Sequence, residues 1–233
     1  MTKAFAIYKK DVMSLFFSPA AYVTVALFMF LVSLMGAGNM YQASMRDVFG
    51  YMSLFMIFVI PMATMRVFSE EMRQGTIELL MTSPAPLWAL VLGKFAAVMT
   101  LIAAIFALSG EFVIFIAKYG KPDWGPVISG YIGLLLLSSS FVSIGVFSSS
   151  LTKNQFISAV ICFVVMLFFM VINTLSEFFG QGAAAEILNQ LAIFTHFYDF
   201  DKGLITLSNV VYYAGFTFLF LFLTVRNLET RRW

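Results

Sequence analysis

The chain has 233 residues, of which 61% are hydrophobic and only 11% are charged, and its formal net charge is +2. Soluble domains are about half apolar and about a quarter charged, so this composition, with a mean hydropathy of +0.93, indicates a membrane protein with several spans. The small net charge gives no reason to expect nucleic acid as a partner, and the single cysteine, Cys162, cannot form an internal disulfide.

An amphipathic segment opens the chain over residues 3–17. Lys3, Lys10 and Ser14 fall on one side of a helix, and apolar side chains fall on the other, namely Phe5, Tyr8, Val12, Leu15 and Phe16. We expect this helix to lie in the membrane interface, with its basic residues near the lipid headgroups. Anchoring is the simpler role for such a helix, and bracing a soluble partner is the alternative.

Six apolar runs are long enough to cross a bilayer, which takes roughly 20 helical residues. They cover residues 20–38, 49–68, 87–117, 127–151, 156–175 and 207–225. The sequence therefore predicts an all-α membrane protein with six spans in one transmembrane domain over residues 1–233. The third run would extend about 46 Å at 1.5 Å per residue, so it must tilt, project from the membrane or break. A cleaved signal peptide is a competing interpretation of the first run, but this run is longer than a signal core.

The basic residues predict the orientation of the chain. With six spans both termini lie on one side, and placing them in the cytoplasm puts most lysines and arginines there, leaving Arg46, Lys118, Lys121 and Lys202 outside. We therefore expect a multi-pass protein of the cell (inner) membrane with both termini in the cytoplasm.

A charged island over residues 69–86 separates the second and third runs, and the predicted topology places it in the cytoplasm. Glu70 and Glu71 suit a short first helix, Gly75 can adopt the conformation that ends it, and Thr76 can cap a second helix. Glu78 then falls in the first turn of the second helix, where its charge is favourable. A short helix held between two spans has the form of a docking element.

Residues 71–84, EMRQGTIELLMTSP, resemble the signature of the ABC-2 family of ATP-binding-cassette transporter permeases, especially its gliding-motility-associated and nitrous-oxide-reductase-maturation branch. The similarity covers the whole chain, from the interfacial helix to the long outer segment before the sixth span. It implies that the island forms a coupling helix that inserts into a groove of a nucleotide-binding subunit. The residues then expected to contact the ATPase are Glu70, Glu71, Arg73, Gln74, Gly75, Thr76, Ile77, Glu78, Leu79 and Leu80. The alternative is a solvated loop whose charges only fix the topology.

The chain carries no recognisable ATP-binding motif. Gly93-Lys94 lacks the upstream glycine and the following Ser or Thr of a P-loop, and Gly120-Lys121 is followed by Pro122. We therefore expect ATP and Mg²⁺ to be bound by a partner ATPase, and no cofactor, metal site or catalytic residue in this chain. His196, the single histidine, is interpreted as an interfacial residue of the outer side.

The segment 176–205 is expected on the outer side, and a connection of this length usually has structure of its own. The ABC-2 resemblance implies short re-entrant helices that close the outer mouth, with a possible gate of Phe194, Phe197, Tyr198 and Phe200. Anchoring in the membrane interface explains these aromatic residues equally well.

Two polar residues lie where a transport pathway could pass. Glu111 lies inside an apolar run near its outer end, and a carboxylate there must face protein or water, reach the headgroups or be protonated. Lining the pathway and reaching the headgroups are equally open. Asn173 is a second pathway candidate, although it and the serines of residues 138–150 are more often contacts between packed helices.

These observations favour a permease subunit that pairs with a second copy of itself or a paralogue and binds two cytoplasmic ABC ATPase subunits. The family resemblance favours export over import, and no residue selects among lipid, glycan, peptide and drug-like substrates. One alternative is a secondary transporter or channel that uses Glu111 as its ion site. Another is a membrane scaffold that recruits a cytoplasmic complex.

Overall fold

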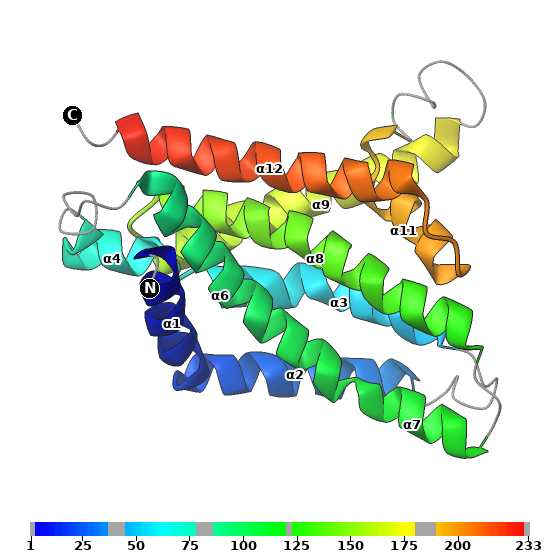
Figure 1. The fold of residues 1–233 in the computed structure, drawn as a ribbon. Helices are drawn as coiled ribbons and strands as arrows, with labels where there is room; N and C mark the ends of the chain where they lie inside the picture. The colour runs from blue at the N-terminus through cyan, green and yellow to red at the C-terminus, as the bar shows by residue number, and fades with distance from the viewer. Residues whose placement is uncertain (1–2, 37–44, 78–85, 120–122, 180–189, 231–233) are drawn as a thin grey trace.

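The computed structural model describes residues 3–36, 45–77, 86–119, 123–179 and 190–230, and within these ranges the regular structure is entirely helical. The expected all-α class is confirmed. The helices, drawn in Figure 1, are α1 (Lys3–Phe16), α2 (Pro19–Gly36), α3 (Arg46–Thr64), α4 (Ser69–Gln74), α6 (Leu87–Leu108), α7 (Gly110–Tyr119), α8 (Trp124–Leu151), α9 (Gln155–Phe179), α11 (Ile193–Asp201) and α12 (Leu207–Thr230).

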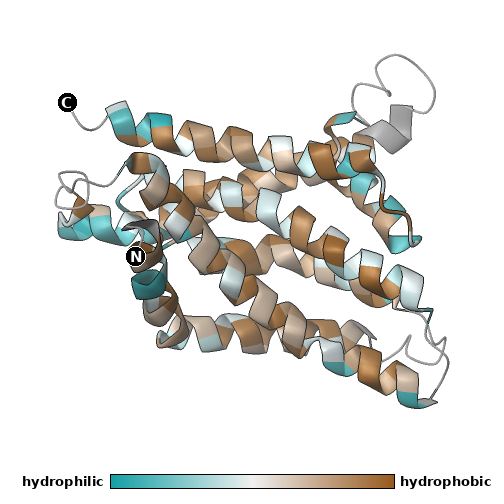
Figure 2. Cartoon of the chain, viewed as in Figure 1, coloured by the Kyte–Doolittle hydropathy of each residue, from teal (hydrophilic) through white to brown (hydrophobic). Residues whose placement is uncertain are grey.

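Five helical segments in the described ranges are long and apolar enough to cross a membrane. They are Arg46–Gln74, Leu87–Lys118, Trp124–Leu151, Gln155–Ile172 and Leu207–Thr230. The first predicted span corresponds to α2, which counts as a sixth when it is taken together with α1. The long helices run side by side, and hydrophilic residues gather toward the two ends of the bundle (Figure 2).

The N-terminal helix α1 is bent from α2 by 68°, as an interfacial helix before a span would be. It packs against α6, where the Tyr8 hydroxyl lies 3.0 Å from the hydroxyl of Thr100. The opposite surface of α1 is open, and Phe17, just after its end, is 81% exposed. An apolar ring so exposed at the corner between α1 and α2 is well placed to enter a bilayer.

Two of the predicted runs are interrupted in the structure. The run expected over residues 49–68 ends as helix α3 at Thr64, three residues after Pro61, and a four-residue turn leads to α4. The long third run is divided at Ser109 into α6 and α7. The Ser109 hydroxyl donates to the Phe106 carbonyl and lies 3.1 Å from the Tyr131 hydroxyl of α8, so polar contacts accompany the break.

Helix α8 lies at the centre of the bundle and packs against α3, α6, α9, α11 and α12. Close approach requires glycine at Gly133, because a Cβ there would lie 2.6 Å from the Cβ of Phe200. Serines of α8 join it to its neighbours: the Ser139 hydroxyl lies 3.0 Å from that of Thr217, and the Asn227 amide donates to the Ser150 carbonyl at 2.7 Å. Contacts between packed helices are confirmed for Ser139, Ser140, Ser149 and Ser150. Ser148 donates within its own helix, and the Ser138 hydroxyl has no hydrogen-bond partner in the described residues.

Candidate functional site

The charged island begins with α4, a helix of six residues at the end of the bundle where α1 and α6 begin, which we call the α4 end (Figure 1). Gly75 ends α4 with a φ of 71°, a left-handed conformation in which an L side chain is strained. The prediction that Gly75 ends this helix is confirmed. The Thr76 hydroxyl donates back to the Glu71 carbonyl at 3.3 Å, and its role as the cap of a second helix stays a prediction, because most of that helix lies outside the described residues.

The turn between α3 and α4 is fixed to α8 by a single hydroxyl group. The Ser149 Oγ accepts hydrogen bonds from the backbone N–H groups of Phe68 and Ser69, at 2.9 and 3.1 Å, and donates to the Met65 carbonyl at 3.2 Å. Ser149 is fully buried, so these bonds satisfy backbone groups that water does not reach. The position of α4 is therefore set by the central helix.

The two faces of α4 differ in exposure. Ser69 and Met72 are buried against the bundle, whereas Arg73 and Gln74 are exposed, as are Gly75 and Thr76 after the helix. Arg73 makes no hydrogen bond or ion pair in the described part of the chain. Helix α4 thus presents a polar outer surface while its inner face is held by packing.

A buried lysine lies behind α4. Lys94 of α6 is only 4% exposed, and its Nζ lies 2.9 Å from Oε2 of Glu71 and 3.4 Å from Oδ2 of Asp11 in α1. The Nζ of Lys10 lies 3.7 Å from the other carboxylate oxygen of Glu71, and the ring of Phe68 lies 5.2 Å from the Lys94 Nζ. We call Lys10, Asp11, Glu71 and Lys94 the Lys94 cluster.

The Lys94 cluster links three elements that are far apart in the sequence. Removing ions from water costs several kcal/mol each, and the mutual attraction of a buried pair offsets this cost only while both partners are present. In the described ranges Lys94 is the partner of Asp11 Oδ2 and Glu71 Oε2, neither of which has a further hydrogen bond. The cluster therefore ties α1, α4 and α6 to one another more strongly than surface ion pairs could.

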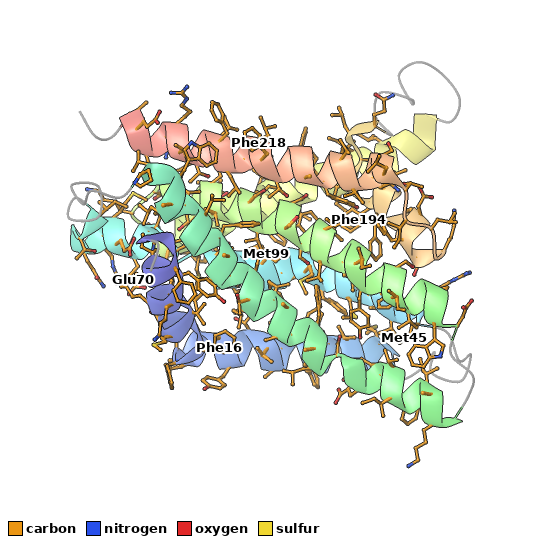
Figure 3. The ribbon with its side chains drawn as sticks, in the orientation of Figure 1. Phe16, Met45, Glu70, Met99, Phe194 and Phe218 are labelled. Carbon is orange, nitrogen blue, oxygen red and sulfur yellow. The ribbon has the colours of Figure 1, made fainter. Side chains whose placement is uncertain are left out.

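A cleft of about 290 Å³ opens beside the Lys94 cluster, and we call it the α4 cleft. Its walls come from α1, from the turn after α3 and from α4, and Lys94 lies among its lining residues. Figure 3 shows Glu70, another lining residue, on the part of α4 that lies next to α1. Acidic and basic side chains line this cleft in equal number.

The predicted ATPase-contact residues are thus divided. Glu70, Arg73, Gln74, Gly75 and Thr76 are at least partly accessible, and Ile77 is half-buried and helical. The carboxylate of Glu71 is bound to Lys94 and Lys10 inside the protein, so any effect of Glu71 on a partner is indirect. Three further members of the predicted set, Glu78, Leu79 and Leu80, lie outside the described residues.

The opposite end of the bundle, which we call the α11 end, holds the predicted outer aromatic residues. Phe194, Phe197 and Tyr198 line a second cleft of about 440 Å³, the α11 cleft, which opens between α3, α9 and α11. Phe197 and Phe200 are buried, whereas Tyr198 is exposed. Figure 3 places Phe194 at this end. Three of the four predicted gate residues therefore meet at one cleft, and Phe200 packs into the core instead.

An acidic residue also lines the α11 cleft. One carboxylate oxygen of Asp201 is buried and has no hydrogen-bond partner in the described residues. Burial raises the pKa of the Asp201 carboxyl to about 6, against the opposing charges of Arg46 and Lys202, and Asp47 adds to the rise. Asp201 therefore takes up a proton at about pH 6 and is still mostly ionised at pH 7.

Helix α11 is also hydrogen-bonded to α12. The His196 ring lies 2.8 Å from Asn209 Oδ1, and the Asn209 amide donates to the His196 carbonyl at 3.2 Å and to Asp199 at 2.9 Å. The ring stacks on Tyr212 with 4.0 Å between centroids. His196 therefore holds two helices together, and the described residues contain no group of His, Cys, Asp and Glu that could hold a metal ion.

Glu111, one of the two pathway candidates, lines neither cleft. Glu111 lies in the first turn of α7 with its side chain exposed on the outside of the bundle, a position from which it can reach lipid headgroups. Asn173 belongs to α9, and its side chain lies outside the described residues.

Comparison with known families identifies the chain. A family model described as ABC-2 family transporter protein matches residues 17–224. The chain belongs to this family. It is therefore a membrane-embedded permease subunit of an ATP-binding-cassette transporter, in a family whose members are typically non-catalytic and work with ABC ATPase subunits. No curated protein matches the chain.

Sequence reasoning missed two residues of this ABC-2 permease. Lys94 was considered only as a charge that helps to fix the topology and as part of a rejected P-loop, and Asp11 was not singled out. A lysine inside an apolar run was the available signal, because ionisable side chains in membrane spans are nearly always paired. Its partners, Asp11 and Glu71, are distant in the sequence, so the pairing itself had no local pattern.

Proposed function

We propose that α4 is the helix through which a separate cytoplasmic ATPase drives this permease. The observation that carries the proposal is the contrast between its faces: the outer surface exposes Arg73 and Gln74, whereas the inner face is fixed by Ser149 and Lys94. A helix whose charges only fixed the topology would not need two buried polar attachments. The matching position of the ABC-2 signature supports the same role.

The attachments suggest how movement would spread. Glu71 joins α4 to α6 and α1 through Lys94, and the Ser149 hydroxyl joins the start of α4 to α8. Because packed helices move as rigid bodies, a displacement of α4 would shift α1, α6 and α8 together. We propose that nucleotide binding to the ATPase produces this displacement and that hydrolysis resets it.

We further propose that the permease lies in the cell inner membrane with both termini in the cytoplasm and pairs with a second copy or a paralogue. Helix α9 offers a surface for pairing, since Val160, Val164 and Phe168 are exposed along one face, although lipid could cover this face instead. Export is the proposed direction, because ABC-2 relatives mostly export. The gliding-motility-associated and nitrous-oxide-reductase-maturation branch remains a prediction, as does the substrate class.

At the α11 end we propose that only the aromatic residues facing the cleft act in an outer gate. Phe194, Phe197 and Tyr198 line this cleft, while the buried Phe200 fixes α11 to the bundle. Opening the cleft would then require α11 to tilt about its buried contacts. Tyr198→Ala should therefore change transport at unchanged ATPase binding, whereas Phe200→Ala should destabilise the protein by about 3–5 kcal/mol.

The decisive experiment is copurification of the permease with a candidate ABC ATPase subunit. Arg73→Glu should reduce the amount of bound ATPase by about tenfold, because one favourable charge becomes a repulsive one, and should leave the thermal midpoint of the permease unchanged. Arg226→Glu is the matched control, since Arg226 is also exposed near an end of its helix but belongs to α12. Equal loss in both variants, or no loss in either, would contradict docking at α4.

The same preparation tests the remaining candidates. A secondary transporter that used Glu111 would move substrate in vesicles without any ATPase and would lose activity in Glu111→Gln. A scaffold would bind the ATPase, yet no candidate substrate would stimulate ATP hydrolysis in the reconstituted complex. The exposed position of Glu111 gives no support to an enclosed ion site.

A further inference from the structure

The α4 cleft contains one unpaired cation and one acid with only weak internal contacts. Arg66, in the turn before α4, has no hydrogen bond or ion pair in the described part of the chain, and it lines the cleft. Glu70 has only a 3.4 Å contact with the side-chain amide of Gln74, which leaves its carboxylate largely open. The charges of Lys10, Asp11, Glu71 and Lys94 balance among themselves, so Arg66 and Glu70 are left to act on a ligand.

The cleft also lies where lipid headgroups are expected. Lys10, Ser14 and Ser18 recur at every fourth position along α1 and the residues that follow it, and all three line the cleft. Beside them Met13 and Phe17 are exposed, at 49% and 81%. Since α1 bends away from the first span by 68°, its polar edge lies at headgroup depth while its exposed apolar side chains reach the acyl chains.

From this arrangement we propose that the α4 cleft binds the headgroup of a zwitterionic phospholipid, with Arg66 on the phosphate and Glu70 on the ammonium group. The Ser14 hydroxyl and the exposed ammonium of Lys10 add donors for phosphate oxygens. The volume of about 290 Å³ is near the lower end of the roughly 300–1,000 Å³ typical of ligand pockets, which suits a headgroup whose acyl chains stay outside.

The geometry favours phosphatidylethanolamine over other phospholipids. Its primary ammonium carries N–H donors that Glu70 can accept, whereas the quaternary ammonium of phosphatidylcholine has none. Phosphatidylglycerol offers a phosphate to Arg66 but has no cation for Glu70. A lipid bound here would lie between α1 and α4, so its headgroup would contact the helix proposed to receive the ATPase.

The test uses the delipidated, full-length permease without its ATPase, so it is independent of the proposed coupling function. Apparent dissociation constants are measured by native mass spectrometry for phosphatidylethanolamine, phosphatidylcholine and phosphatidylglycerol with identical acyl chains. Wild type should bind phosphatidylethanolamine several-fold more tightly than phosphatidylcholine. Arg66→Gln should weaken binding of all three lipids about tenfold, the loss expected for one charge-assisted contact, and Arg66→Lys should restore part of it.

Glu70→Gln tests the other half of the site. It should abolish the preference for phosphatidylethanolamine over phosphatidylcholine while leaving phosphatidylcholine binding unchanged. Arg226→Gln and Glu111→Gln are the controls, because each removes one exposed charge that does not line the cleft. Both should bind lipid like wild type, and thermal midpoints check that every variant is folded.

Three results would overturn the proposal. The first is equal affinity for the three lipids, or Arg66→Gln binding like wild type. The second is competition by soluble phosphoethanolamine at concentrations equal to the lipid, which would identify a small phosphate compound as the ligand. The third is unchanged lipid binding by Arg66→Gln together with loss of ATPase copurification, which would make the cleft a protein contact.

Discussion

The two ends of the bundle handle buried polar groups in opposite ways. At the α4 end the buried Lys94 is paired with two carboxylates from different helices, and Ser149 satisfies the backbone groups of a chain turn. At the α11 end Asp201 leaves one buried carboxylate oxygen without a hydrogen bond, and α11 is joined to α12 by a histidine and an asparagine. The α4 end is therefore held by buried ion pairs, whereas the α11 end is held by hydrogen bonds, among them buried ones from Ser129 to the Phe200 carbonyl and from Tyr213 to the Ile193 carbonyl.

This difference follows from electrostatics. Separating a buried ion pair exposes charges to a medium that solvates them poorly, so the paired arrangement is strongly favoured. A hydrogen bond that is exchanged for one to water costs only about 0.5–1.5 kcal/mol net. The ion pairs at α4 are therefore expected to be costlier to separate than a single hydrogen bond at α11.

The largest effect on stability is expected for Lys94→Met, because Lys94 makes the strongest contacts of the α4 end. Removing the lysine leaves Asp11 and Glu71 buried without a counter-charge, so the free energy of unfolding should fall by about 3–5 kcal/mol. Thermal unfolding in detergent measures this loss. The triple variant Asp11→Asn, Glu71→Gln, Lys94→Met, which removes all three charges, should recover much of it. If Lys94→Met alone were as stable as wild type, the charges of the Lys94 cluster would have to be solvated by water.

Ser149→Ala should produce the next largest effect. It removes the acceptor of the Phe68 and Ser69 N–H groups, and leaving buried donors unsatisfied costs about 1–3 kcal/mol. Ser148→Ala is the matched control, because that neighbouring buried hydroxyl donates only to the Ile144 carbonyl of its own helix, at 2.9 Å. Hydrogen exchange of residues 65–74 should quicken in the Ser149 variant alone. The same exchange rates in both variants would show that α4 does not depend on this bond.

Gly75→Ala should cost about 1–2 kcal/mol through backbone strain, because Gly75 has a φ of 71° and alanine is disfavoured there. A Cβ at Gly75 would have no neighbour within 4 Å, so the loss is not steric. Gly215 in α12 has the same open space but a helical conformation, and Gly215→Ala should therefore be neutral or stabilising. Thermal midpoints compare the two, and a loss of equal size in both would point to a general effect of the added methyl group.

Much of this fold was predictable from local sequence patterns. The apolar runs predicted the spans, because a segment inside the membrane must make its backbone hydrogen bonds within a helix. Gly75 predicted the end of α4, because few other residues adopt a left-handed conformation. The break at Ser109 was foreseen only as one of three outcomes. It followed from contact with Tyr131 of α8, which no pattern within residues 87–117 encodes.

The candidate site was less predictable than the fold. The exposed residues of α4 could be found from their charge, but the roles of Glu71 and Lys94 depend on three helices meeting at one point. The positions of the aromatic residues of α11 also depend on packing that the local sequence does not encode. Phe194, Phe197 and Tyr198 line the α11 cleft, whereas Phe200 packs against Gly133 of α8, and this division depends on how α11 faces its neighbours.

Asp201→Asn tests the α11 end and should have the smallest effect on stability, and this effect depends on pH. Burial raises the pKa of Asp201 from 3.8 to about 6, so the folded state binds a proton more readily than the unfolded state does. The resulting stabilisation is fully present below about pH 4 and is lost as the pH rises through about 6. Solvent screening at this half-exposed carboxyl limits the change to about 1 kcal/mol or less.

Thermal midpoints between pH 4 and pH 8 should therefore fall in wild type and stay level in Asp201→Asn. Asp47→Asn should shift the fall to lower pH, because it removes a negative charge that raises the Asp201 pKa. A wild-type midpoint that rises over this range would mean that Asp201 is stabilised as a carboxylate, and the contrast between the two ends would disappear.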